Sequence, residues 1–295
     1  MRTVLLSFLL DISFVSGGCG GETPPAESPP PVTATPDASA SVGALDSTHA
    51  LSPAVNDAGT ETAKPPAHVA WSYTGEGAPD KWGDLAPSFA LCKDGKAQTP
   101  IDISSKLPKS PTLEGLVFQY PTIPLAIFNN GHTVEVPNPG PAAVAEGSKK
   151  WNLLQFHFHA PSEHTLDGKQ YDAEVHFVHA NDKGELAVVG VFVKKGKENA
   201  ALKAVFVNAP SEIGTDPKPV AGATVDLKAV LPAKPSYFTY DGSLTVPPCT
   251  EGVTWFLLKA PIEASVEQIA EFHEVTHGDT DRPVQPLNGR TVLRY

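Results

Sequence analysis

Short runs of apolar side chains, many of them alternating with polar ones, fill the chain from Trp71 onward. This pattern, punctuated by Gly, Pro and Asn, is typical of short β-strands. We predict strands over residues 116–120, 126–129, 133–136, 151–159, 173–179, 186–193 and 253–259. Two helices are predicted, over residues 198–207 and 265–275, the second because Ser265 and Gln268 have the spacing of a capping box. Many strands and few helices predict a mainly β (α+β) domain, with a large sheet and peripheral helices.

Two neighbouring predicted strands place histidines on one face of this sheet. The period of two within residues 151–159 puts His157 and His159 on one side and the intervening phenylalanine on the other. The next strand also alternates, and Asp167-Gly168 between the two strands is a turn signal. In a simple hairpin about that turn, the residue numbers of the two members of each cross-strand pair add up to 335. His159 would then lie opposite His176. We therefore predict three converging imidazoles.

Three neutral imidazoles without a fourth protein ligand are typical of a catalytic zinc site, in which water takes the open position. Gln155 and Glu174 each lie two residues before a histidine of this group, and hence on the same face of the sheet. From there their side chains would accept hydrogen bonds from the imidazoles and orient them.

The composition allows a sizeable core, because 41% of the 295 residues are hydrophobic. The formal net charge is −11. Nucleic acid and anionic membrane surfaces repel an acidic protein, so we expect neither as a partner, whereas a neutral small substrate is unaffected.

The N-terminal part differs from the rest in composition. Residues 1–19 have the outline of a signal peptide, with an apolar run and the sequence Ser-Gly-Gly before Cys19. Those small residues make Cys19 a candidate for lipid attachment, although Asp11 interrupts the apolar run; ordinary cleavage and a mis-assigned start are the alternatives. Residues 20–67 are rich in Pro and Ala and predict a disordered tether, which leaves residues 68–295 as a single folded domain.

The folded part contains only two cysteines, Cys92 and Cys249. In an exported domain, two distant cysteines predict one disulfide, with two free buried thiols as the alternative. We expect the protein in the periplasm or as an outer-membrane or cell-surface lipoprotein, or else secreted.

Several segments resemble, in order, the motifs of exported bacterial α-class carbonic anhydrases. They are Trp71–Tyr73, Gln98–Asp102, Asn129–His132, Gln155–His164, Ala173–His179 and Ser243–Trp255. Carbonic anhydrase is itself the standard example of the three-histidine zinc site. The resemblance implies the family's fold, with a large, mostly antiparallel, twisted central sheet and short peripheral helices. It also implies the family's reaction, the reversible hydration of carbon dioxide to bicarbonate and a proton.

The resemblance further implies how the reaction proceeds. Zn²⁺, bound by His157, His159 and His176, carries a hydroxide that attacks carbon dioxide. Thr245 accepts a hydrogen bond from that hydroxide and donates its own proton to Glu163. Glu163 must be ionised for this, because a carboxylate can only accept hydrogen bonds, whereas a protonated carboxyl group can also donate one. His132 carries the product proton to buffer, a task that suits an ordinary imidazole pKa of about 6.5.

Further residues take supporting roles by the same resemblance. An apolar pocket for carbon dioxide is formed by Val178, Val188, Leu244 and Trp255. Tyr73 joins the water network, His164, His179 and Glu174 support the fold or the ligands, and Cys92 and Cys249 occupy the positions that are bridged in bacterial members. If the protein forms an oligomer, we expect a dimer.

Two residues depart from the family pattern, and two other functions compete with it. Val246 stands where many members have a second hydroxyl. The carboxylate of Glu135 stands where a neutral amide is more frequent, and it would favour the protonated form of His132.

The segment from His157 to Glu163 also fits the cupin pattern, in which the glutamate is a fourth ligand to iron or manganese. The non-enzymatic alternative is a catalytically silent, carbonic-anhydrase-like binding module.

Overall fold

The computed structural model describes residues 69–295. The predictions for residues 1–19 and 20–67, Cys19 included, lie outside these described residues. No helix within 69–295 is long and apolar enough to cross a membrane.

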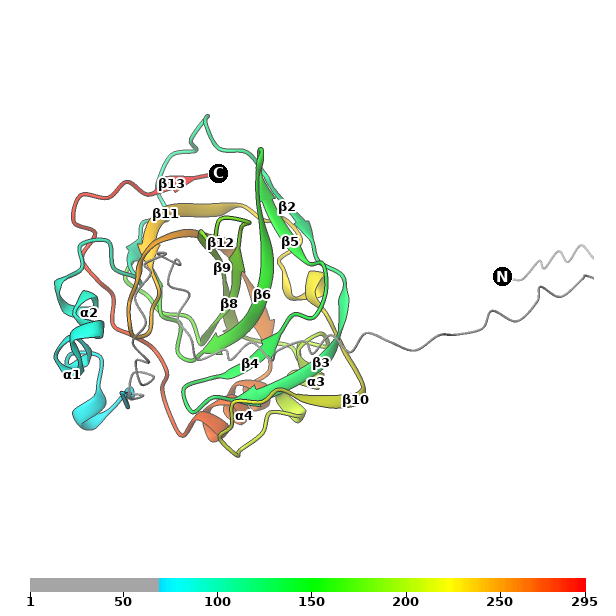
Figure 1. The fold of residues 1–295 in the computed structure, drawn as a ribbon. Helices are drawn as coiled ribbons and strands as arrows, with labels where there is room; N and C mark the ends of the chain where they lie inside the picture. Colours follow the sequence, from blue (N-terminus) through cyan, green and yellow to red (C-terminus); the bar gives the residue numbers. More distant parts are fainter. Residues whose placement is uncertain (1–68) are drawn as a thin grey trace, which may run out of the picture. The chain divides into compact units, whose positions relative to one another are not determined.

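The secondary structure consists mainly of strands (Figure 1). The strands are β1 (Asp102–Ile103), β2 (Leu116–Gln119), β3 (Thr122–Asn129), β4 (Val134–Pro137), β5 (Ala143–Glu146), β6 (Lys149–His159), β7 (Thr165–Leu166), β8 (Ala173–Ala180), β9 (Leu186–Lys195), β10 (Lys218–Asp226), β11 (Tyr237–Ser243), β12 (Glu251–Ala264) and β13 (Leu293–Arg294). The α-helices are α1 (Trp82–Leu85), α2 (Leu91–Asp94), α3 (Lys203–Val207) and α4 (Val266–Thr276), and the 3-10 helices are η1 (Gly75–Gly77), η2 (Pro87–Phe89) and η3 (Leu227–Val230).

One 11-stranded sheet dominates the described part of the chain, in the order β10-β3-β4-β6-β8-β9-β12-β11-β13; off this path, β5 pairs with β6 and β2 pairs with β5. Within this sheet of the described residues, β9 and β12 pair in parallel and the other pairs are antiparallel. The helices α3 and α4 pack together near β3, β4 and β10 (Figure 1). The predicted fold class, a mostly antiparallel sheet with short peripheral helices, is confirmed.

A β-bulge in β6 decides which side chains of that strand enter the main core. The register with β8 shifts between Leu153 and Gln155. Trp151 and Leu153 before the shift, and Phe156 and Phe158 after it, therefore all join the same hydrophobic cluster. A bulge inserts one residue and reverses the side on which the following residues point. The opposite face after the bulge is left to Gln155 and the histidines.

The helix at 265–275 is confirmed, whereas the one at 198–207 is wrong in its first half. Ser265 accepts a hydrogen bond from the Gln268 backbone, and the Gln268 side chain accepts from the Ser265 backbone, which completes the capping box. Helix α3 begins only at Lys203, because the Asn199 side chain accepts from the backbone of Ala201 and Leu202 and holds a turn there. Such local side-chain bonds compete with the helix.

The seven predicted strands all exist, but β1, β5, β7, β10, β11 and β13 were not predicted. Strand β5 is rich in alanine, a poor strand former. Strand β10 contains Pro219 and Gly222, lies at the edge of the sheet and is largely exposed. Pairing with neighbouring strands, β5 with β2 and β6 and β10 with β3, places both in the sheet more than their own residues do.

Candidate active site

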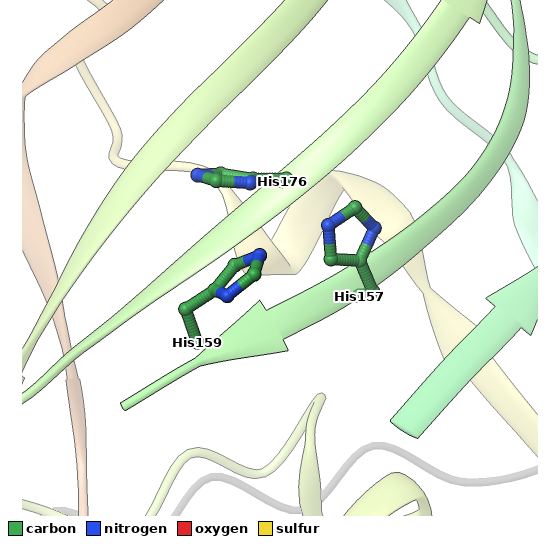
Figure 2. A group of neighbouring side chains, drawn as sticks. All are labelled: His157, His159 and His176. Atoms are coloured by element: carbon green, nitrogen blue, oxygen red, sulfur yellow. The ribbon is translucent and has the colours of Figure 1, made fainter. Parts of the chain in front are cut away.

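Three histidines meet on the face of the sheet that the β6 bulge leaves to polar side chains. His157 and His159 extend from β6 and His176 from β8, and their rings converge (Figure 2). One ring nitrogen of each lies within 4.8 Å of those of the other two. The predicted convergence is therefore confirmed.

The predicted register of this pair of strands is wrong by two residues. His157, not His159, lies opposite His176, and His159 lies opposite Glu174. The connection between the strands contains β7 and is not a tight turn, so the sum of 335 does not hold. A shift of two residues keeps every side chain on its own face, and for that reason the histidines still meet.

Each imidazole is oriented by one hydrogen bond from its second ring nitrogen. His157 Nδ1 donates to Gln155 Oε1 at 2.8 Å, and His176 Nε2 donates to Glu174 Oε1 at 2.9 Å, as the sequence predicts. His159 Nδ1 donates to the carbonyl of Thr280 at 2.6 Å. The remaining nitrogens are His157 Nε2, His159 Nε2 and His176 Nδ1, and that of His159 is buried without a hydrogen-bond partner among the described residues. A metal ion would satisfy it.

Burial keeps the three rings in the form that binds metal. Removal from water lowers the pKa of His157, His159 and His176 below the ordinary imidazole value, and the neighbouring histidines add to the effect at His157. The donors are then neutral imidazoles at physiological pH, the form that ligates zinc. The residues present therefore fit a zinc ion.

Glu174 is a buried carboxylate that serves two histidines. It accepts from His176 and from the ring and backbone nitrogens of His164. Burial would raise the pKa of Glu174, but His164 and His176 hold it well below its ordinary value. His164 in turn accepts from the Tyr240 hydroxyl at 2.6 Å. The ionised carboxylate is thus fixed from several sides.

Glu163 points one oxygen at the open side of the histidine cluster. Its Oε2 lies 3.6 Å from His159 Nε2 and 3.9 Å from His176 Nδ1. Its Oε1 accepts from the backbone N–H of Arg282 at 3.0 Å. Burial raises the pKa of Glu163 to about 7, while His176, the Arg282 N–H and Thr245 oppose the rise. A cation bound by the histidines would add to that opposition and favour the ionised form.

The predicted pocket residues adjoin the histidine cluster, since the ring centroids of Trp255 and His176 are 4.9 Å apart. Thr245 is buried in the loop between β11 and β12. Val178, Val188 and Trp255 lie directly beside one another on β8, β9 and β12, and Leu244 packs against the same cluster. The four predicted pocket residues are therefore brought together.

The chain matches the family model described as eukaryotic-type carbonic anhydrase over residues 77–295. It is 44% identical over 228 residues to a carbonic anhydrase of Nostoc sp., covering 76% of this chain and 86% of the relative. A carbonic anhydrase of Pectobacterium carotovorum is 41% identical over 226 residues, covering 76% and 91% of the two chains. The α-carbonic anhydrase of Thermovibrio ammonificans, solved with the inhibitor sulfanilamide, superposes with a TM-score of 0.72 at 44% identity, covering 76% of this chain and 99% of that one.

The chain belongs to the carbonic anhydrase family. It is an enzyme of carbon dioxide hydration, and its histidine cluster fits the zinc site of that family. The cupin and silent-module alternatives are not supported. Two groups among the described residues could hold a metal, His157 with His159 and His176, and His164 with Glu174 and His176. Neither group includes Glu163, the fourth ligand of the cupin pattern, and the relatives are named as enzymes.

The carbonic anhydrase segment predicted to carry the proton forms the turn between β3 and β4. Asn130 Oδ1 accepts from the backbone N–H groups of His132 and Thr133, which shapes the turn. The His132 ring stacks on Trp71, with 3.6 Å between ring centroids and 7° between planes. Tyr73, also predicted from the sequence, has a buried hydroxyl without a hydrogen-bond partner among the described residues.

Glu135, one of the two departures from the family pattern, lies opposite His157 in the pairing of β4 with β6. Burial raises its pKa to about 7. Burial thus opposes the ionised form of Glu135, which is the form that the expected effect on His132 requires.

Sequence reasoning missed three residues that shape this carbonic anhydrase site. The backbone carbonyl of Thr280 holds His159, and the backbone N–H of Arg282 holds Glu163. Backbone groups are the same in every residue type, so the sequence does not reveal these contacts. Gly190 lies between His176 and Leu257 in one row of the sheet. A Cβ atom there would lie 2.6 Å from Leu257 Cδ1 and 3.0 Å from Glu174 Oε1. A glycine inside a predicted strand was the available signal.

Proposed function

We propose that hydration of carbon dioxide takes place at a zinc ion held by His157, His159 and His176. The observation that carries this proposal is the convergence of three ring nitrogens, one from each histidine. The other nitrogen of each ring is held by a hydrogen bond to a protein acceptor. When bound, zinc supplies a Lewis acid that lowers the pKa of water to about 7, for which carbonic anhydrase is the standard example.

The residues around the histidines would orient and separate the reactants. Thr245 lies near enough to Glu163 to oppose the rise in the pKa of that carboxyl, and its hydroxyl would donate to Glu163. The Thr245 oxygen could then only accept from the attacking group and would hold that group in one orientation. Val178, Val188, Leu244 and Trp255 offer carbon dioxide an apolar wall without competing hydrogen bonds. His132, in its turn beside Trp71, takes up the product proton and passes it to buffer.

The zinc assignment is tested by replacing a ligand. His176→Ala removes one of three donors, so bound zinc is expected to fall from one per chain to nearly none, and hydration activity with it. Elemental analysis and stopped-flow hydration, with and without a chelator, measure the two effects. His273→Ala is the matched control, because His273 lies on α4 and pairs with Asp279. A His176→Ala variant with one tightly bound zinc and normal activity would contradict the assignment.

We also propose that the protein is exported, as a periplasmic or surface lipoprotein or in secreted form. The disulfide between Cys92 and Cys249 supports this, because cytosolic proteins rarely keep one. The lipid anchor rests on Cys19 alone, and a dimer is the oligomer that we expect. Mass spectrometry of the mature N-terminus tests the anchor: a free Cys19 thiol or a start beyond it would contradict it.

A further inference from the structure

Arg282 is a buried cation that the reaction itself does not use. Its guanidinium donates to two backbone carbonyls, from Nη1 to Thr99 at 2.7 Å and from Nη2 to Cys92 at 2.9 Å. It lies 5.8 Å from the centroid of the Trp82 ring. The residue is 1% exposed, and burial lowers its pKa to about 10. Such a charge is costly to bury, so its place in the fold calls for a reason.

The backbone of the same residue holds Glu163. The Arg282 N–H donates to Glu163 Oε1, and two residues earlier the Thr280 carbonyl accepts from His159. The segment 280–282 therefore contacts one proposed ligand and the proposed partner of Thr245. Further along, the Gln285 N–H donates to the Pro100 carbonyl. The segment is thus attached both to the site and to the N-terminal part of the domain.

These contacts form a closed ring of residues that includes Glu163 and Thr245. Thr245 and Cys249 belong to the same loop, and Cys249 is bonded to Cys92. The Cys92 carbonyl receives Arg282 Nη2, and the Arg282 N–H reaches Glu163. Thr245 acts on Glu163 in turn and lowers its pKa. The step between Thr245 and Glu163 belongs to the proposed function, and every other link of the ring is a covalent bond or a hydrogen bond between buried groups.

We propose that Arg282 is a positioning residue that transmits the constraint of the disulfide to Glu163. Its guanidinium fixes segment 280–282 against Cys92 and Thr99, and the backbone N–H of Arg282 then aims Glu163 at Thr245. The proposal rests on the proposed function of that pair. Lysine cannot take the place of Arg282, because one ammonium group lacks the planar fork that reaches two carbonyls at once.

The first test is the kinetics of Arg282→Lys, expressed per bound zinc. Misplacing Glu163 affects the attack on carbon dioxide, so kcat/KM is expected to fall about tenfold to a hundredfold. In weak buffer, kcat is expected to fall less while proton export limits it. A residue that only stabilises the fold would lower the amount of active enzyme and scale both parameters together.

Arg290→Lys is the matched control. The Arg290 guanidinium also donates only to backbone carbonyls among the described residues and lies over the Tyr240 ring; the carbonyls are those of Gln98, Asp241, Pro286 and Leu287. The Arg290 backbone N–H donates to Leu287 and not to Glu163. Its kcat/KM is expected to stay within about twofold of the parent value. Equal losses in Arg282→Lys and Arg290→Lys would overturn the proposal.

The second test is a double-mutant cycle between Arg282→Lys and the pair Cys92→Ser with Cys249→Ser. Opening the ring at either place should release most of the constraint, so the combined loss in kcat/KM should be well below the product of the separate losses. Independent, multiplicative losses would overturn the proposal. If Arg282→Lys does not fold, Arg282→Gln, which keeps one donor, takes its place in the cycle.

The two proposals fail in distinguishable ways. A parent protein without stoichiometric zinc or chelator-sensitive activity would contradict the proposed function. Zinc-loaded variants that retain full kcat/KM would contradict only the role of Arg282.

Discussion

At the scale of single residues, the proposed function assigns one set of groups to holding the attacking species and a separate residue to removing the proton. The three histidines, Glu163 and Thr245 are buried or half-buried around one space. His132 lies in the turn between β3 and β4, stacked on Trp71. Substitutions in the two sets should therefore change different kinetic parameters.

His132→Ala is expected to lower kcat at low buffer about tenfold to a hundredfold while kcat/KM stays nearly constant. This follows because kcat/KM reports the steps through bicarbonate release, whereas kcat includes export of the proton. Stopped-flow hydration in weak buffer measures both, and added imidazole should restore part of kcat. His277→Asn, at the exposed end of α4, is the control. Unchanged kcat in His132→Ala would mean that another group carries the proton.

At the scale of elements, rows of side chains across neighbouring strands build the site. His157, His176, Gly190 and Leu257 form one row across β6, β8, β9 and β12. The missing side chain at Gly190 leaves room for the carboxylate of Glu174 beneath His176. The absence of a side chain at Gly190 therefore helps to place Glu174 at the proposed metal site.

Gly190→Ala is expected to weaken zinc binding about tenfold to a hundredfold, because the added methyl group displaces Glu174 from His176. The rate of zinc transfer to a chelator measures this without reference to activity. Gly196→Ala is the matched control, since its methyl group would meet Glu263, whose carboxylate lies at the surface.

Leu257 also approaches the added methyl group, so Gly190→Ala with Leu257→Val separates the two contacts. We expect the faster zinc release to persist in the double variant. Full recovery there would assign the effect to packing against Leu257 and not to Glu174.

At the scale of the whole molecule, the disulfide joins the N-terminal helical region to the Thr245 loop. Cys92 and Cys249 are buried in a cluster with Trp82, against which Trp71 and Tyr73 pack. They are 157 residues apart in the sequence. Closing so long a loop restricts the unfolded chain strongly.

Replacing both cysteines with serine is expected to lower the free energy of unfolding by about 3–5 kcal/mol. Denaturant titrations of the metal-free protein measure this without the contribution of bound zinc. The parent protein kept in a reductant should show the same loss. An unchanged midpoint and slope in both cases would contradict a stabilising disulfide.

The sequence by itself determined the elements with strong local signals and the convergence of the three histidines. The period of two placed His157 and His159 together, and the residues two positions earlier supplied acceptors for His157 and His176. The capping box at Ser265 marked the start of α4. Such features depend on neighbours a few positions away, so residue type and spacing are sufficient to predict them.

Only the tertiary structure decided the register of β6 with β8, the bulge before Gln155, and the contacts of Thr280 and Arg282. His159 and Thr280 are 121 residues apart, and Glu163 and Arg282 are 119 apart. Those contacts use backbone atoms, which every residue type offers alike. Their partners are therefore chosen by the packing of the whole chain, and no local pattern in the sequence records that choice.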